Sequence, residues 1–145
     1  MTAEIVVFYG EEVNIEQAKK LHQLCADKLL QNYPLCDILI TWDKTKDVTG
    51  KKVVCPVDVR LLGSPAGRVT YSADDNSADI VAINVQKHTD YISFELMSAD
   101  HMGRVFIDNS KNISAADVLV VAAVMYAAGV PLKSVISAVN SILKN

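Results

Sequence analysis

Several features that would assign this sequence to a class of protein directly are absent. Its three cysteines, Cys25, Cys36 and Cys55, are odd in number and contain no Cys-x-x-Cys pair. This argues against both a disulfide framework and a zinc site. The longest apolar stretch, residues 118–130, is shorter than the roughly 20 residues that a membrane-spanning helix needs. The first residues carry no positively charged leader and no cleavage site. We therefore expect a soluble, cytoplasmic protein with reduced thiols.

Positive charge is also scarce. The formal net charge is −3, and the nearest approach to a basic cluster is broken by two aspartates: Lys44, Lys46, Lys51 and Lys52, with Asp43 and Asp47 between them. A protein that binds nucleic acid usually gathers its positive charge on one face. We expect neither a nucleic acid nor a membrane as partner. The length of 145 residues suits one domain, residues 1–145.

Motifs for phosphate binding and covalent catalysis are missing as well. Residues 10–14 follow an apolar run, as a phosphate loop would, but they contain one glycine and two acids. Phosphate binding favours several glycines and a lysine at that position. Residues 63–67 are richer in glycine but precede a strand pattern, and no Gly-x-Ser-x-Gly occurs. The sequence therefore predicts no cofactor and no metal, and it leans away from an enzyme.

The first third of the sequence alternates between strand and helix patterns. The apolar run from Glu4 to Tyr9 predicts a buried strand. Ile15 to Gln31 has apolar residues at helical spacing and predicts an amphipathic helix, with Asn14 as its N-cap. Asp37 to Trp42 predicts a core strand. A further strand pattern covers Val53 to Leu62, although Pro56 is incompatible with an unbroken central strand.

The rest of the sequence predicts a group of short strands and then two helices. The strand patterns are joined by short polar turns, which favours an antiparallel meander: Arg68–Ser72, Asp79–Val85, Tyr91–Met97 and Arg104–Ile107. Ala115 to Ala128 is a nearly all-apolar helix that ends at Gly129, and a second helix begins at Pro131. The expected fold is α/β (α+β): a mixed sheet with one amphipathic helix after strand 1, a central antiparallel meander and a C-terminal helical hairpin.

A few polar residues in the predicted connections are candidates for ligand binding. Asp74 and Asp75 lie in an acidic turn that resembles a calcium loop but lacks its glycine and its distal glutamate. His88 and His101 lie in polar turns between strands, where binding residues tend to occur. Asp43 follows the strand that ends at Trp42. A solvated turn is the simpler interpretation of the acidic turn, and nothing in the spacing of the histidines requires a metal site with their neighbours Asp90 and Asp100.

The nearly all-apolar helix carries a different hypothesis. A helix without a polar face has to be covered on every side. Either the sheet and the last helix of this chain cover it, or another chain does. In the second case the interface would include Val118, Val121, Val124 and Met125.

From Asp37 onward the order of segments resembles the later part of the central domain of Mur-type amide ligases, ATP-dependent enzymes that add amino acids to cell-wall precursors. The resemblance covers about two-thirds of the chain and rests on order and composition. The stretches that carry it are Ile38–Asp43, Val69–Ser72 with Ala78–Val85 and Ile92–Leu96, and the helical hairpin from Asn112 to Leu143.

The chain departs from that family at the residues that would bind ATP. The family's glycine-rich phosphate loop and its magnesium-binding residues are absent. The family opens the hairpin with a His-Asn…Asn pattern near the nucleotide, whereas this chain has Lys111-Asn112 and then Ala115. Only Asn112 is retained as a candidate, and ATP binding is not implied.

Three functional hypotheses remain open from the sequence. The first is a non-enzymatic binding or assembly module that acts through a protein partner or as a homo-oligomer. The second is a small-ligand-binding protein or small enzyme that uses the loops at the strand ends. The third is a degenerate Mur-ligase-like half-domain that depends on a partner to supply the phosphate loop.

Overall fold

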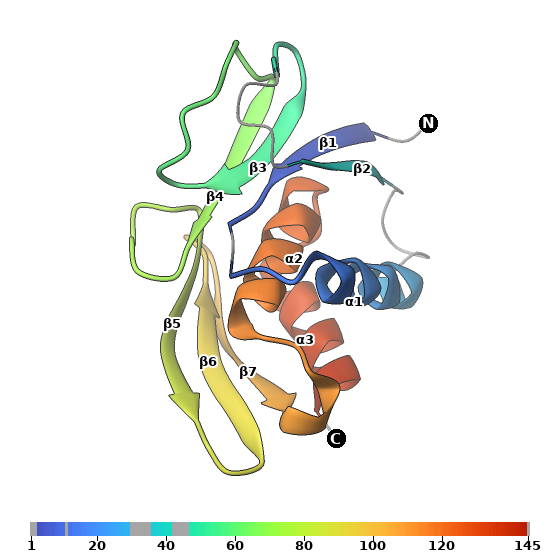
Figure 1. Ribbon diagram of the computed structural model, residues 1–145, viewed down its shortest axis with the longest axis vertical. Helices are drawn as coiled ribbons and strands as arrows, with labels where there is room; N and C mark the ends of the chain where they lie inside the picture. The colour runs from blue at the N-terminus through green and yellow to red at the C-terminus, as the bar shows by residue number, and fades with distance from the viewer. Residues whose placement is uncertain (1–2, 11, 30–35, 42–46, 145) are drawn as a thin grey trace.

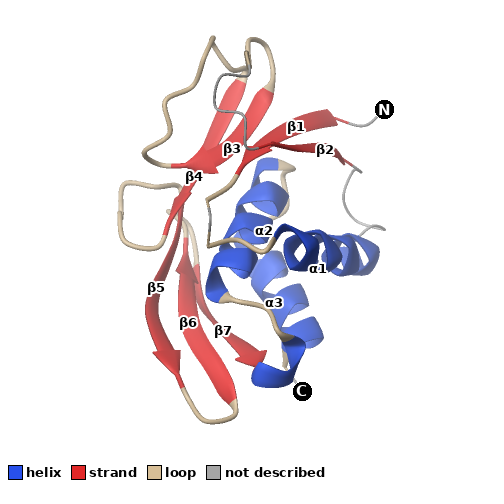
Figure 2. Ribbon diagram, viewed as in Figure 1, coloured by secondary structure: helices blue, strands red, loops and turns tan. Residues whose placement is uncertain are grey.

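A computed structural model describes residues 3–10, 12–29, 36–41 and 47–144 of the chain. Within these residues, seven strands form one sheet, and three α-helices lie on one side of it (Figures 1 and 2). The elements in chain order are β1 (Ala3–Phe8), α1 (Ile15–Leu29), β2 (Cys36–Thr41), β3 (Lys52–Pro56), β4 (Gly67–Ser72), β5 (Ile80–Lys87), β6 (Tyr91–Met97), β7 (Met102–Asp108), a short 3-10 turn (Asn109–Lys111), α2 (Ala115–Ala127) and α3 (Leu132–Leu143).

The strand order is β2-β1-β3-β4-β5-β6-β7. Neighbouring strands from β2 to β5 run parallel, and β5, β6 and β7 form an antiparallel meander. The predicted α/β class is therefore confirmed, with the helix after the first strand, the meander and the C-terminal hairpin all present. Among the residues with described structure, no helix is long and apolar enough to cross a bilayer.

Two details of the predicted sheet are wrong. The segment Arg68–Ser72 was expected to open the antiparallel meander, but β4 runs parallel to β5 through only two pairs, Tyr71 with Ile80 and Ser72 with Val81. The connection doubles back because Asp79 binds Thr70 in both directions: Thr70 N donates to Asp79 Oδ2 at 2.8 Å, and Asp79 N donates to Thr70 Oγ1 at 3.0 Å. The chain therefore resumes beside the end of β4 and continues in the same direction.

The second concerns the strand pattern from Val53 to Leu62, where the interruption expected at Pro56 is confirmed but the strand does not resume after it. The strand ends at Pro56, and Val57 N donates the last backbone hydrogen bond to β4, at Tyr71 O. Val59 N donates back to Pro56 O at 3.2 Å, which closes a turn. Proline has no backbone N–H and therefore cannot donate a hydrogen bond to a neighbouring strand, so a strand often ends at a proline. This turn places residues 57–59 at the carboxyl end of β3.

α2 forms the centre of the core. It contacts β1, β3, β4, β5 and β6, while α1 and α3 pack against it from the other side. The proposed interface side chains, Val118, Val121, Val124 and Met125, are 0 to 5% exposed. Their own chain covers them because α2 lies between the sheet and the other two helices. They form no surface in this fold, and a partner could reach them only if α1 or α3 moved away.

Side chains of α3 close the outer edge of β7. Phe106 N donates to Asn140 Oδ1 at 2.9 Å, and Asn140 Nδ2 donates to Arg104 O at 2.9 Å. One amide side chain therefore satisfies a backbone donor and a backbone acceptor on the edge of β7 that does not pair with β6. Gly103 permits this approach, since a Cβ there would lie 2.9 Å from Ile136 Cδ1.

Candidate functional site

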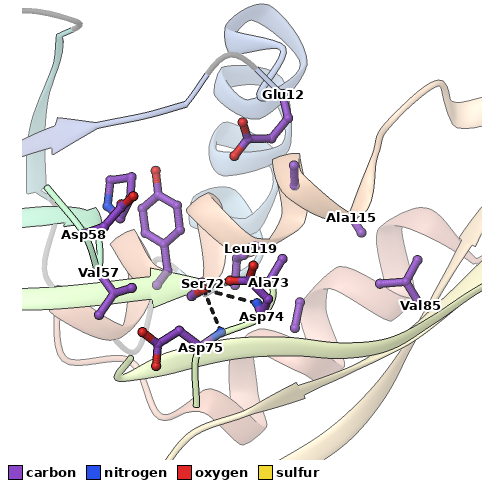
Figure 3. Close-up of a pocket in the computed structure, with 14 residues that line it drawn as sticks. Glu12, Val57, Asp58, Ser72, Ala73, Asp74, Asp75, Val85, Ala115 and Leu119 are labelled. Atoms are coloured by element: carbon purple, nitrogen blue, oxygen red, sulfur yellow. Dashed lines mark hydrogen bonds between the residues drawn. The ribbon is translucent and has the colours of Figure 1, made fainter. Parts of the chain in front are cut away.

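A cleft lies where the order of the parallel strands reverses. β1 has β2 on one side and β3 on the other, so the chain leaves β1 in one direction and later returns to its opposite edge. In open α/β sheets, ligands bind beyond the carboxyl ends of the strands at such a switch point. The cleft has a volume of about 450 Å³, and the segments after β1, β3 and β4 line it together with the first turn of α2 (Figure 3).

The walls and floor of the cleft are apolar. Val57 and Val85 face it from different strand ends, and Ala115 and Leu119 face it from α2. Tyr71 contributes the floor and is 3% exposed. Its hydroxyl donates to Phe8 O at 2.7 Å, which ties β4 to the end of β1. Burial raises the pKa of Tyr71 above its ordinary value, so the hydroxyl remains a neutral donor.

Four carboxylates surround these apolar walls: Glu12, Asp58, Asp74 and Asp75. Figure 3 shows Glu12 and Asp58 on one side of the cleft and the two aspartates of the β4–β5 connection on the other. No lysine, arginine or histidine is among the described residues that line it. The charge of this cleft is therefore of one sign, which opposes the binding of a phosphate group and favours a cation.

Ser72 fixes the aspartates of the β4–β5 connection. Its Oγ donates to Asp74 Oδ1 at 2.9 Å and accepts hydrogen bonds from the backbone N–H groups of Asp74 and Asp75 at 3.1 and 3.0 Å. Asp75 Oδ1 in turn accepts from Ser77 Oγ at 2.6 Å and Ser77 N at 2.9 Å. The hydrogen bond from the Ser77 side chain, and after it the one from the Ser77 backbone, lower the pKa of Asp75 and favour its ionised form.

The helix beginnings beside the cleft are already capped. Asp117 is 1% exposed, and its carboxylate accepts from Asn14 N at 2.7 Å and from Ser114 N at 3.1 Å. Ser114 Oγ accepts from Asp117 N at 3.2 Å, which completes a capping box on α2. Asn14 Oδ1 accepts from Gln17 N at 3.3 Å on α1. One buried carboxylate thus satisfies the backbone N–H groups of the N-cap residues of both helices, Asn14 and Ser114.

The structure brings together two of the predicted site residues, Asp74 and Asp75. His88 lies just before β6 and His101 lies between β6 and β7, and His88 stacks on Tyr91 with ring centroids 4.3 Å apart. Asn112 adopts a left-handed conformation, with φ of 60°, between β7 and α2. None of these three lines the cleft. Asp43 lies outside the described residues. In the described part of the chain, no group of three or more His, Cys, Asp or Glu is placed to hold a metal ion.

Sequence reasoning missed Glu12 and Asp58. Glu12 lies in the segment that was tested only as a phosphate loop, where its charge has the wrong sign. Its carboxylate folds against Gly10, where a Cβ would lie 2.6 Å from the nearest carboxylate oxygen. Asp58 lies within the strand pattern from Val53 to Leu62, and the interruption expected at Pro56 was not used to place a strand end just before it. Ending that strand at Pro56 would have placed Asp58 directly after a carboxyl end.

Comparison with solved structures shows which fold this is. The chain matches a structure of UDP-N-acetylmuramoylalanyl-D-glutamyl-2,6-diaminopimelate--D-alanyl-D-alanyl ligase from Acinetobacter baumannii with a TM-score of 0.58 and 8% identity, over 96% of this chain and 46% of that one. A second structure, MurF from Acinetobacter baumannii, matches with a TM-score of 0.59 and 8% identity, over 99% of this chain and 46% of that one.

The fold is Mur-ligase-like. The chain spans less than half the length of these ligases, and at 8% identity the likeness concerns the fold alone. No protein-family model and no curated protein sequence matches the chain. Within this Mur-ligase-like fold, the strand-end cleft is our candidate binding site.

Proposed function

We propose that this chain is a small-molecule-binding domain with a Mur-ligase-like fold. Its ligand occupies the strand-end cleft and carries an apolar body with a positively charged group. The sequence resemblance from Asp37 onward supports placing the likeness in the later part of the ligases' central domain. The position of the cleft, at the switch point between β1 and β3, is the observation that carries the proposal.

The lining of the cleft supports the chemical class of the ligand. Val57, Val85 and Leu119 offer apolar surface, and binding pockets usually combine such surface with a few polar groups that orient the ligand. The polar groups here are carboxylates, which attract an ammonium or guanidinium group. The capped helix beginnings argue against carrying ATP binding over from the ligases, because Asp117 already uses the backbone N–H groups of Asn14 and Ser114.

The first hypothesis from the sequence, an assembly module, receives less support. Its interface was expected on α2, whose side chains are enclosed by the sheet, α1 and α3. A protein partner or self-association through another surface remains a separate proposal. The third hypothesis, a half-domain whose partner supplies a phosphate loop, also receives less support, because the acidic lining of the cleft disfavours a phosphate group.

The proposal is tested with n-hexylamine, which combines an alkyl body with one ammonium group. Titration of the isotope-labelled protein should shift the NMR signals of the cleft residues, whereas hexanoate should bind more weakly. The variant Glu12→Gln/Asp58→Asn should weaken hexylamine binding about three- to tenfold, the range expected for two exposed ion pairs. Both side chains are exposed, so the variant should stay folded.

The matched control is Asp90→Asn/Asp100→Asn, which removes two carboxylates from turns beyond β5 and β6. It should leave hexylamine binding unchanged. An equal loss in both variants would show that hexylamine responds only to net charge. Signal changes confined to residues outside the cleft would contradict the proposal outright.

A further inference from the structure

A second hollow, shallower and more open to solvent than the acidic cleft, adjoins it. It has a volume of about 490 Å³ and lies under the connection between β3 and β4. Val57 and Asp58 line both hollows, so the two meet across this short segment, which Figure 3 shows at one side of the cleft. A ligand longer than the cleft would therefore enter the second hollow by passing over Val57 and Asp58.

The charge of the second hollow differs from that of the first. Arg60 and Arg68 line it, with Asp58 at the shared boundary. Arg60 is exposed. Arg68 Nη2 donates to Val59 O at 3.0 Å and to Val57 O at 3.5 Å, which holds its guanidinium beneath the segment. The first hollow offers carboxylates, and the second offers guanidinium groups.

The segment that separates the hollows is held in place from both sides. Val59 is 7% exposed and packs into a small cluster with Phe8 and Cys55 on the sheet face opposite the helices. Val57 N donates to Tyr71 O at 3.1 Å. Because its backbone and its buried side chain are both fixed, the segment keeps the acidic and basic hollows at a constant separation, which favours a ligand of matching length.

We propose that the two hollows form one extended site for a ligand with an ammonium group at one end and an oxyanion, carboxylate or phosphate, at the other. The ammonium group occupies the acidic cleft, the apolar middle crosses Val57, and the oxyanion reaches Arg60. This inference rests on the proposed function and adds a second recognition point to it. The opposite orientation is disfavoured because it would place like charges together in both hollows.

Arginine suits this role because its planar guanidinium binds carboxylate and phosphate through paired hydrogen bonds. Arg68 is partly committed to the backbone carbonyls of Val57 and Val59, so it acts as the fixed wall of the hollow. Arg60 carries no such structural bond in the part of the chain that is described. Replacing Arg60 therefore tests recognition without disturbing the 57–59 segment.

The experiment compares n-alkylamines with ω-aminoalkanoates and ω-aminoalkyl phosphates of the same chain length, using NMR titration at low salt. At one matching length, a bifunctional probe should bind about three- to fivefold more tightly than the amine, as expected for one exposed ion pair. Arg60→Ala should remove this advantage and leave the Kd of the alkylamine unchanged. Lys133→Ala removes one exposed positive charge on α3 and is the matched control.

The outcomes separate this inference from the proposed function. If alkylamines bind in the cleft but no bifunctional probe of any length binds more tightly, the second recognition point is wrong and the cleft proposal stands. If Arg60→Ala and Lys133→Ala reduce the advantage equally, the effect is one of net charge and the inference also fails. If alkylamines do not bind in the cleft, the proposed function itself fails. The probe series that gains affinity, carboxylate or phosphate, identifies the oxyanion.

Discussion

Asp117 is the residue that connects the beginnings of α1 and α2. Its buried carboxylate caps α2 and also accepts a hydrogen bond from Asn14 N, 103 positions earlier in the chain. The N-terminal ends of α1 and α2 are thereby joined through a negative charge. A helix beginning is favourable for an anion, and here the anion belongs to the protein itself.

A second residue, His22, should make the stability of the protein depend on pH. The hollow that it lines is otherwise formed by apolar side chains of β1, α1 and α2. Burial lowers the pKa of His22 below its ordinary value of 6.5. Between the two pKa values the unfolded chain binds more protons than the folded one, so stability falls as the pH falls. The contribution of His22 is complete above about pH 6.5 and is lost as the pH drops through the lowered pKa.

Urea unfolding measured from pH 7.5 down to 5 should therefore show a smaller free energy of unfolding at the acid end. His22→Gln should flatten this part of the profile, since glutamine does not titrate. Gln23→Ala, a change of an exposed neighbour, should leave the slope as it is. The prediction fails if the His22→Gln profile runs parallel to that of the unchanged protein.

At the scale of elements, Asn140 links α3 to the outermost strand. Its side chain pairs with Phe106 N and Arg104 O, both at 2.9 Å, on the open edge of β7. Asn140→Ala should lower the free energy of unfolding by about 1–2 kcal/mol, because a backbone donor and a backbone acceptor lose their partner. It should also promote association, since an unpaired strand edge can bind another chain.

Chemical denaturation and light scattering measure these two effects. Ser141→Ala is the control, because Ser141 is exposed on the same turn of α3. An Asn140→Ala protein with the stability and solubility of the control would show that the edge of β7 needs no cover.

Most elements were predictable because each has a local signal. α1 begins after Asn14 and follows the spacing of its apolar residues, and α2 ends at Gly129, whose φ of 97° suits glycine. The parallel pairing of β4 and β5 was not predictable, because it depends on Asp79 bonding back to Thr70. No pattern of hydrophobicity reports such a side-chain bond.

At the scale of the whole molecule, the cleft was predictable only in part. Asp74 and Asp75 are adjacent in sequence, were predicted as candidates, and both line the cleft. Glu12 and Asp58 join them only because β1, β3 and β4 are neighbours in the sheet. A sequence shows where strands end, but the order of strands decides which ends meet. For the same reason the sequence left open whether α2 is covered by its own chain.

That last alternative can be decided by a double variant. Val121→Asp/Met125→Lys places two charges at positions that are 2% and 5% exposed. The two opposite charges lie four residues apart on α2 and can pair with each other, but removing each from water still costs about several kcal/mol, and packing is lost as well. The total is comparable to the 5–15 kcal/mol by which most domains are stable. The variant should therefore be unfolded by circular dichroism. The same substitutions at exposed sites, Leu24→Asp/Met102→Lys, should leave the protein folded, since these side chains are 48% and 54% exposed. A folded Val121→Asp/Met125→Lys monomer, obtained from a dimeric parent, would instead assign α2 to an interface and overturn the enclosed core on which the proposed cleft is built.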